Sequence, residues 1–279
     1  MFKVKLMRKG DFQFATKLAN TMNWNMATED FKFITNLEPD GCFVVFNGGE
    51  RVGISTSISF GRVGWFGNLI VEEKWRNMGV GSLLVNHSVN YLKNRGAQTI
   101  GLYAYPNLVN FYSHLDFKLD EDFWVLHAEN LCSLAAEALP PVGKRQVKAV
   151  EKFDCRCFGG DRKKLLESII FEEGNLSCFK SVGNLVLGYV AATVYEKTAW
   201  VGPLMCRESE GDIAVSLLKA VLANLAGKSV YTVLPKKEVA LADLLFSAGF
   251  KEEFFASRMF LGKAVAKNCI YVAESLERG

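Results

Sequence analysis

Hydrophobic and polar residues alternate along short runs in the first 127 residues, and longer segments between them place hydrophobic residues every three or four positions. The alternating runs predict strands, and the longer period predicts amphipathic helices. A basic last turn followed by Gly96 marks the end of one helix. The expected strands cover residues 2–7, 42–46, 52–60, 63–71, 99–104 and 117–126, and the expected helices cover 11–36, broken near 23–28, 79–95 and 106–114.

The same order of elements returns more weakly after residue 145. Residues 128–145 are interpreted as a connector, with a short helix over 128–138 that ends before Pro140-Pro141. The pattern therefore predicts an α/β protein of two similar units in tandem, with limits at 1–127 and 146–279. In the second unit the expected strands cover 147–153, 176–180, 186–195, 199–204, 230–233, 254–261 and 269–273, and the expected helices cover 162–171, 213–225 and 238–247.

Composition and charge exclude several classes of protein. The 279 residues are 49% hydrophobic and 23% charged, which is typical of a globular chain rather than a disordered one. The net charge of +3 comes without a basic stripe, so we expect no nucleic-acid partner. The longest apolar run, Leu185 to Tyr195, is shorter than the about 20 residues that a membrane helix needs. The N-terminus carries charges where a signal peptide would be apolar, and we expect no membrane partner.

Seven cysteines are scattered along the chain without a Cys-x-x-Cys pair, and none of the three histidines stands at zinc-ligand spacing from them. This pattern predicts no metal site. Cys155 and Cys157, the nearest pair, are interpreted as buried or half-buried thiols rather than as a metal or redox site. Free thiols are typical of a reducing compartment, so we expect a cytoplasmic protein, with a nuclear location left open.

The segment from Asn68 to Leu84 carries the chemistry of the first half. A hydrophobic strand runs into Arg76-Asn77-Met78-Gly79-Val80-Gly81, and a helix is expected to begin at the last glycine. Glycines let the backbone approach a ligand closely, and the amides at a helix N-terminus attract anionic oxygens, so this loop suits a pyrophosphate. A dinucleotide-binding loop would need a third glycine, and a P-loop would need Gly-Lys-Ser/Thr, and neither pattern is present here.

This loop resembles the acetyl-CoA motif of the Gcn5-related N-acetyltransferases (GNAT), (Arg/Gln)-x-x-Gly-x-(Gly/Ala). A second motif of that family, Phe-Tyr-x-x-x-Gly-Phe, is matched by residues 111–117, except that Asp116 replaces the glycine. The resemblance implies a mixed, mostly antiparallel sheet flanked by helices, with acetyl-CoA as cosubstrate. It also implies direct transfer of an acetyl or other short acyl group to an amine of a small molecule or a peptide. The near-neutral net charge slightly favours a small amine over a very basic acceptor.

The second half resembles a YitH/HolE-type domain, a diverged copy of the same fold. It has no Arg-x-x-Gly-x-Gly between Cys206 and Asp212. The resemblance therefore implies one CoA site, in the first half, and a second domain that shapes the acceptor pocket or the fold. The matching residues are Asp154 with Asp161-Arg162, Val201-Gly202-Pro203-Leu204, Pro235, Ala248-Gly249-Phe250, Arg258-Met259, Gly262 and the strand around Tyr271.

The resemblance also assigns roles to single residues. Tyr112 is implied as the general acid for the CoA thiolate, with a core tyrosine as the alternative. The strand edge at Leu69, Ile70 and Val71 is implied to pair with the pantetheine arm, and the N–H of Val71 to contact the oxyanion. Asn107 and Asn110 are interpreted as pantetheine contacts or as helix caps. The residues implied to hold the pyrophosphate are Arg76, Asn77, Met78, Gly79, Val80, Gly81 and Ser82.

The strand over residues 62–70 departs from the family, because it lacks the glutamate that many members carry there as the general base. Its absence leaves a second class of function open, an acyl-CoA-binding sensor or scaffold without catalysis. The base is left open among a water-mediated route, the second domain and the carboxylates Glu29 and Asp30, with Glu72 and Glu73 interpreted as solvated turn residues. His87 is interpreted as structural, and the aromatic residues interpreted as acceptor-pocket or core side chains are Trp24, Trp65, Phe66 and Trp124.

Overall fold

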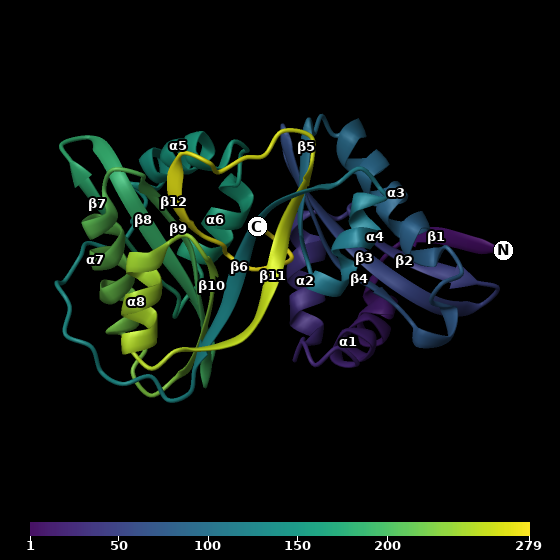
Figure 1. Ribbon diagram of the computed structural model, residues 1–279, viewed down its shortest axis with the longest axis horizontal. Coiled ribbons are helices and arrows are strands. Elements are labelled where there is room, and N and C mark those ends of the chain that lie inside the picture. Colours follow the sequence, from purple (N-terminus) through teal and green to yellow (C-terminus); the bar gives the residue numbers. More distant parts are fainter. The chain divides into compact units, whose positions relative to one another are not determined.

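The computed structural model describes residues 1–279, which form two compact units (Figure 1). Unit 1 contains residues 1–102 with Leu261–Lys263 and Arg278, and unit 2 contains residues 103–260, 264–277 and Gly279. The division therefore falls inside a strand, between Leu102 and Tyr103. The domain limits expected from the sequence, 1–127 and 146–279, follow chain order and stay a prediction.

Unit 1 is built on a five-stranded run of sheet in the order β1-β2-β3-β4-β5. Neighbouring strands are antiparallel except β4 and β5, which are parallel. The expected break in the first helical segment is confirmed, because two helices flank residues 21–27. The elements are β1 (Phe2–Leu6), α1 (Phe12–Asn20), α2 (Thr28–Leu37), β2 (Cys42–Asn47), β3 (Glu50–Phe60), β4 (Val63–Val71), α3 (Val80–Asn94) and β5 (Thr99–Ala104), with short 3-10 helices at Lys9–Asp11 and Glu73–Trp75.

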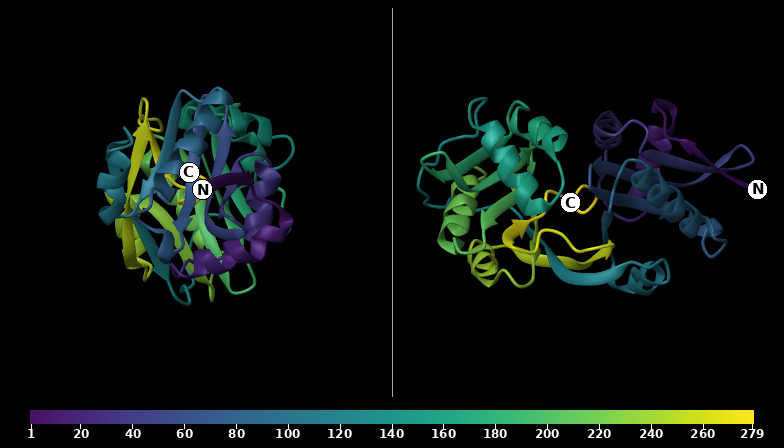
Figure 2. Two further views of the ribbon diagram at one scale, coloured as in Figure 1. Left: turned by 90° about the vertical axis from the view of Figure 1, so that its right-hand side faces the viewer. Right: turned by 90° about the horizontal axis from the view of Figure 1, so that it is seen from above.

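Helix α3 is fixed to the sheet of unit 1 by the apolar face that its periodicity predicts. Val80 and Leu84 of α3 pack with Phe43, Val45 and Val52 in one buried cluster. The right panel of Figure 2 shows this sheet between α3 and the α1–α2 pair. Because Val80 lies in this core, the first turn of α3 is anchored to the sheet.

Unit 1 also takes in a short segment from late in the chain. The Thr99 hydroxyl at the start of β5 donates a hydrogen bond of 2.8 Å to the carbonyl oxygen of Lys263. Gly262, the residue before Lys263, has a φ of +103, and a Cβ at this position would stand 2.5 Å from the carbonyl oxygen of Gln98. Glycine is therefore required at position 262 both by backbone conformation and by close packing.

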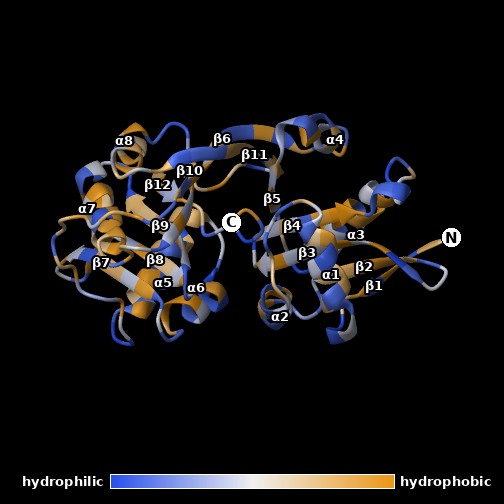
Figure 3. Ribbon diagram, turned by 90° about the horizontal axis from the view of Figure 1, so that it is seen from below, coloured by the Kyte–Doolittle hydropathy of each residue, from blue (hydrophilic) through white to orange (hydrophobic).

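Unit 2 has a sheet in the order β11-β6-β10-β9-β8-β7, with β12 paired to β9. Only β9 and β10 are parallel. Strands β8 and β9 carry mostly hydrophobic residues (Figure 3), and they form one core with α7 and α8. The elements are α4 (Val109–Ser113), β6 (Lys118–Ala128), α5 (Val147–Phe158), α6 (Lys163–Ile170), β7 (Leu176–Val182), β8 (Leu185–Val194), β9 (Thr198–Arg207), α7 (Gly211–Leu222), β10 (Ser229–Pro235), α8 (Val239–Ser247), β11 (Lys251–Leu261) and β12 (Cys269–Val272).

Two expectations for unit 2 are wrong. Residues 147–153 were expected to form a strand but belong to helix α5, because their buried residues Val147, Val150 and Phe153 recur every third position rather than every second. The short helix expected over 128–138 is absent: Ala128 ends β6, and residues 131–143 have no regular structure. The connector is instead held to the rest of unit 2 by a backbone hydrogen bond: the N–H of Leu131 donates to the carbonyl oxygen of Lys228 at 2.9 Å.

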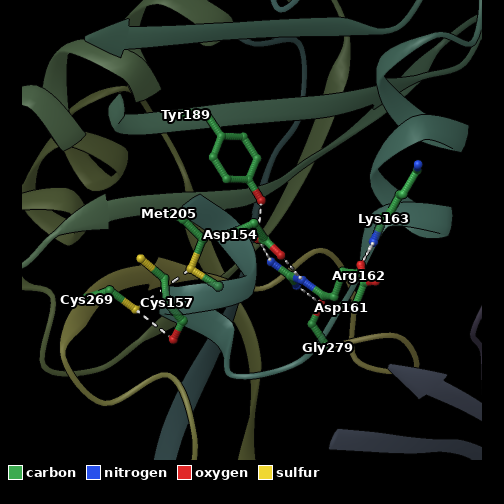
Figure 4. Close-up of polar contacts among 9 residues, drawn as sticks. All are labelled: Asp154, Cys157, Asp161, Arg162, Lys163, Tyr189, Met205, Cys269 and Gly279. Atoms are coloured by element: carbon green, nitrogen blue, oxygen red, sulfur yellow. Dashed lines mark hydrogen bonds and ion pairs between the residues drawn. The ribbon is translucent and has the colours of Figure 1, made fainter. Parts of the chain in front are cut away.

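A buried ion pair joins helices α5 and α6 in unit 2 (Figure 4). The Arg162 guanidinium donates to both carboxylate oxygens of Asp154, at 2.6 and 3.1 Å, and both side chains are fully buried. The same guanidinium donates to the carbonyl of Gly279 at 2.9 Å, and the Tyr189 hydroxyl donates to Asp154 at 2.5 Å. The ring of Phe158 covers the guanidinium at 4.1 Å. All three guanidinium nitrogens of Arg162 and both carboxylate oxygens of Asp154 therefore have hydrogen-bond partners within the core.

Asp154→Ala should destabilise the protein strongly, because it leaves the Arg162 charge buried without its partner. The expected loss in the free energy of unfolding is about 3–5 kcal/mol, measured by urea denaturation of the full chain. Glu137→Ala is the matched control, because its ion pair with Lys180 is exposed and should leave the midpoint unchanged. A midpoint for Asp154→Ala equal to that of the control would show that Arg162 does not depend on Asp154.

Candidate functional site

Strands β4 and β5 of unit 1 are paired only where they begin. The parallel register joins Val63 to Thr99, Gly64 to Ile100 and Trp65 to Gly101, and pairing ends there. Beyond Trp65, β4 runs on to Val71 while its other edge stays bonded to β3. The second half of β4 therefore presents an edge of backbone groups with no strand beside it, which is a site for an extended ligand.

A β-bulge interrupts β4 within this open stretch. Opposite β3, Ile54 pairs with Ile70 and Thr56 with Gly67, so β4 has one residue more than its partner between these positions. Asn68 is one of the residues of this bulge, and its φ of +48 lies in the left-handed region. Its side-chain amide donates a 3.1 Å hydrogen bond to the hydroxyl of Thr56, and both residues are buried. The bulge is therefore fixed by a specific side chain.

The structural role of Asn68 in this bulge was not predicted from the sequence. The signal was a single polar residue inside an otherwise apolar strand, directly after Gly67. Asparagine is among the few residues other than glycine that adopt the left-handed conformation readily. A buried asparagine at such a place therefore indicates a bulge rather than a regular strand.

The backbone of Val71 points to the open edge. The N–H of Glu72 donates to the carbonyl of Val52 at 2.9 Å, so these two opposed residues form a hydrogen-bonded pair. Bonded and non-bonded pairs alternate along antiparallel strands, so Val71, one position earlier, turns its N–H and C=O away from β3. Its carbonyl is taken by Arg76, whose Nε donates at 3.1 Å. The N–H of Val71 accordingly faces the edge on which the sequence motif places the ligand.

The loop after β4 ends in an amide cradle at the start of α3. Asn77 and Gly79 take left-handed backbone conformations, with φ values of +60 and +80. The first helical hydrogen bond runs from the N–H of Leu83 to the carbonyl of Gly79, so the amides of residues 80–82 have no partner within the helix. No side chain caps this end, and the first turn holds no acidic residue. The positive end of α3 is therefore available to an anion.

Gly79 is required by backbone conformation rather than by space. A Cβ at this position would meet nothing within 4 Å, but its φ of +80 disfavours any other side chain. The side chains around it contribute little to the cradle. Arg76 is held by the carbonyl of Val71, Met78 is 55% exposed and Val80 is buried in the core. The cradle is thus made of backbone groups.

Tyr112 lies on α4 in unit 2, in an aromatic setting. Its ring meets Phe111 and Phe117 edge to face, with centroids 5.0 and 5.9 Å away, and its side chain is buried. Burial raises the pKa of this phenol above its ordinary value, so it stays protonated at neutral pH. Asp116, where the motif has glycine, has a φ of +66. The chain conformation that glycine would favour is therefore kept with aspartate in its place.

The remaining candidate residues divide into exposed and structural groups. Asn107 and Asn110 are exposed, and no side-chain hydrogen bond caps α4 or the 3-10 helix before it. Asp30 accepts from the N–H of Ala27 at 2.7 Å and so stabilises the start of α2. His87 packs edge to face on Phe43 at 4.5 Å. Trp65 and Phe66 are buried core residues of unit 1.

Unit 2 repeats the divergent strand pair but fills it with its own chain. The parallel register of β9 and β10 ends at Val201 and Thr232. Strand β12 then pairs along β9 from Leu204 to Arg207, and the N–H of Ala273 donates to the carbonyl of Val233 on β10 at 3.0 Å. Residues 269–273 therefore occupy the gap between the two strands, which we call the β12 slot.

Two further features of unit 2 suit this filled gap. A Cβ at Gly202 would lie 2.0 Å from the carbonyl oxygen of Ala273, so the slot leaves no room for a side chain there. The helix that follows, α7, starts after Glu210 and carries Asp212 in its first turn. These negative charges occupy the positive end of the helix, where α3 of unit 1 has none. At this gap unit 2 thus lacks both the open strand edge and the anion cradle that unit 1 has.

Comparisons with known protein families match both halves of the chain. The model of the acetyltransferase (GNAT) family matches residues 12–117, and that of an acetyltransferase (GNAT) domain matches residues 150–271. A curated relative, the uncharacterized N-acetyltransferase ycf52 of Gracilaria tenuistipitata var. liui, is 31% identical over 75 residues, which are 25% of this chain. The match spans only 40% of that relative's length.

Solved structures of similar fold cover nearly the whole chain. A protein of Pyrococcus horikoshii assigned to the acetyltransferases is 20% identical with a TM-score of 0.82, over 100% of this chain and 96% of that one. A tandem GNAT protein from the clavulanic acid biosynthesis pathway is 13% identical with a TM-score of 0.63, over 95% and 99%. At these identities the likeness concerns the fold alone.

None of the helices has the length and hydrophobicity that a membrane-spanning segment needs.

Asn68→Val should destabilise unit 1 more than Asn68→Gly does. Valine disfavours a φ of +48 and leaves the Thr56 hydroxyl buried without its partner, at an expected cost of about 2–4 kcal/mol in the free energy of unfolding. Glycine adopts that conformation freely and loses only the hydrogen bond and side-chain contacts. Urea denaturation of both variants tests this order, and equal losses would mean that the bulge does not depend on the conformation of residue 68.

Proposed function

The chain belongs to the Gcn5-related N-acetyltransferase superfamily, and on that premise we propose that it is an acyl-CoA-dependent N-acetyltransferase acting on an amine. The observation that carries the proposal is the juxtaposition in unit 1 of an open β4 edge with the uncapped amides of α3. An extended chain of amides and a pyrophosphate are the two parts of CoA that such a pair of features would bind.

Backbone groups would do most of the cofactor binding. The backbone groups of Leu69–Val71 that neither β3 nor Arg76 uses suit the amides of the pantetheine arm, because a ligand strand then replaces the missing neighbour of β4. The amides from Asn77 to Ser82 would surround the pyrophosphate. Arg76 would contribute through its hold on the Val71 carbonyl, which fixes the loop to the strand. Asn107 and Asn110 stay proposed contacts of the pantetheine arm.

The chemistry asks three things of the protein. The amine nitrogen attacks the thioester carbonyl, a C–N bond forms, and the C–S bond breaks with loss of one proton from the nitrogen. The N–H of Val71 would stabilise the oxyanion, because it points to the open edge and is not used by β3. Tyr112 is assigned by its sequence motif as the donor of a proton to the leaving thiolate. Strand β4 contains no carboxylate that could take the amine proton, so the general base stays unassigned.

We assign the single CoA site to the first GNAT domain, with proposed limits 1–127, followed by a connector at 128–145. The second, at 146–279, would be a diverged copy without a cofactor, because β12 fills its strand gap and acidic residues stand at its helix N-terminus. The acceptor is proposed to be an amine of a small molecule or a peptide. The alternative of an acyl-CoA-binding sensor without catalysis finds no support in the family matches.

Gly81→Glu should abolish binding of acetyl-CoA while leaving the protein folded. The new carboxylate would stand in the first turn of α3, where a negative charge repels the pyrophosphate. Isothermal titration calorimetry should give one acetyl-CoA per wild-type chain and no measurable heat for the variant. Gly10→Glu, which makes the same change at an exposed position of unit 1 with open space around it, is the control. Unchanged affinity in folded Gly81→Glu, or two molecules bound per chain, would contradict the proposed site.

Tyr112→Phe should lower kcat by about 10²–10⁴-fold with little effect on acetyl-CoA affinity. The substitution keeps the ring between Phe111 and Phe117 and deletes only the proton donor. Steady-state release of free thiol from acetyl-CoA with a panel of amines supplies kcat, and calorimetry supplies the affinity. Normal turnover would make Tyr112 a packing residue. A joint loss of thermal stability and affinity would assign its hydroxyl to a structural hydrogen bond.

A further inference from the structure

Two cysteines from distant parts of the chain meet beside the β12 slot. Cys157 lies in the last turn of α5, and Cys269 is the first residue of β12. The sulfur of Cys269 lies 3.8 Å from the carbonyl oxygen of Cys157 and 3.8 Å from the sulfur of Met205 (Figure 4). Cys269 is buried, whereas Cys157 is partly exposed. An oxidant therefore has access to one thiol of the pair and not to the other.

The two neighbouring side chains shift each other's acidity in opposite directions. The interaction with Cys269 lowers the pKa of Cys157, and Arg156 and Arg162 act in the same direction, whereas partial burial and Asp154 oppose it. The interaction with Cys157, together with burial, raises the pKa of Cys269. A more accessible thiol of lowered pKa beside a buried thiol is the arrangement of an attacking and a resolving cysteine.

Three other cysteines of unit 2, Cys155, Cys178 and Cys206, lack this combination of properties. Cys155, two residues earlier on the same helix, is exposed, but burial of its surroundings and nearby aspartates raise its pKa. Burial raises the pKa of Cys206 and of Cys178 to about 12. The combination of access, acidity and a neighbouring thiol therefore belongs to Cys157 alone among these four residues.

We propose that Cys157 and Cys269 are an oxidisable dithiol, which a peroxide converts to an intramolecular disulfide between helix α5 and strand β12. The proposal concerns unit 2 and is independent of the transferase activity. The two residues come from elements that already meet, because the sulfur of Cys269 lies 3.8 Å from the carbonyl oxygen of Cys157.

The reaction balances with peroxide as the only oxidant. The Cys157 thiol first releases its proton, and the thiolate attacks one peroxide oxygen. The O–O bond breaks, a sulfenic acid forms, and the other oxygen leaves as hydroxide, which takes up the released proton and becomes water. The sulfur of Cys269 then attacks the sulfenic sulfur, the S–O bond breaks, and the hydroxyl leaves as a second water with the proton of Cys269. Two thiols and one hydrogen peroxide thus give one disulfide and two water molecules.

The disulfide would fasten residues 269–273 in the β12 slot. Only four residues of β12 pair with β9, so this strand is held by few backbone contacts of its own. A bond from Cys269 to α5 would also close the long loop between residues 157 and 269, which reduces the freedom of the unfolded chain. Oxidation should therefore raise the thermal midpoint of unfolding.

The test is thiol counting and peptide mapping of the full chain before and after hydrogen peroxide. All seven cysteines are free, so denatured protein should show seven reactive thiols before treatment and five after it. Mass spectrometry without reduction should find one linked pair of peptides, carrying Cys157 and Cys269, with a mass loss of two hydrogens. Dithiothreitol should restore seven thiols and the original thermal midpoint.

Variants separate the dithiol from a single reactive thiol. Cys155→Ser, the matched control on the same helix, should form the linked pair as the wild type does. Cys157→Ser should not, and Cys269→Ala should leave Cys157 to trap a sulfenic acid that dimedone labels. If Cys269→Ala fails to fold, the wild-type peptide map decides. A link from Cys157 to Cys155 or Cys206, or sulfinic acid at Cys157 with Cys269 still free, would overturn the proposal.

Discussion

Both units depend on one constraint: two parallel strands that diverge leave backbone hydrogen-bonding groups that must find partners. Unpaired amides and carbonyls are costly once they are shielded from water, so such a gap either takes a ligand or is filled by protein. In unit 1 the gap between β4 and β5 is left open after three paired positions. In unit 2 the gap between β9 and β10 is closed by β12 and Ala273. The same topological problem has two solutions in one chain.

The helix that follows each gap agrees with the solution found there. Helix α3 begins at a left-handed glycine with no acidic residue in its first turn, and α7 begins beside Glu210 and Asp212. A free helix N-terminus favours an anion, and a carboxylate placed there satisfies the same positive field from within the protein. The charge at the helix N-terminus and the strand pairing therefore agree: both leave the gap of unit 1 open to a ligand and close that of unit 2. They do so through different residues.

Sequence patterns predicted most elements because those elements bury one clear face. The loop proposed to bind the cofactor could be located between β4 and α3 because its glycines and the strand before it are local in the chain. The match to both GNAT models confirms the family and the fold. Helix α5 was misassigned because Val147-Lys148-Ala149 alternates as in a strand, and only the fold shows that Val147, Val150 and Phe153 are the buried residues. The bulge at Asn68 had a sequence signal that was missed. Two features could not be predicted from the pattern: the filling of the gap by residues 269–273 and the contact of Cys157 with Cys269. Each depends on residues that meet only in the fold.

The position of β12 in the sequence bears on the order in which the protein matures. In unit 2 the edge of Leu204–Arg207 that faces away from β8 has no partner until residues 269–273 have been synthesised. Unit 1 likewise includes Leu261–Lys263, which lie beside Thr99. Multidomain proteins usually complete their N-terminal domain first during synthesis. Here neither unit is complete before residues 261–273 have been synthesised, so these strand edges stay open, and able to pair with another chain, until then.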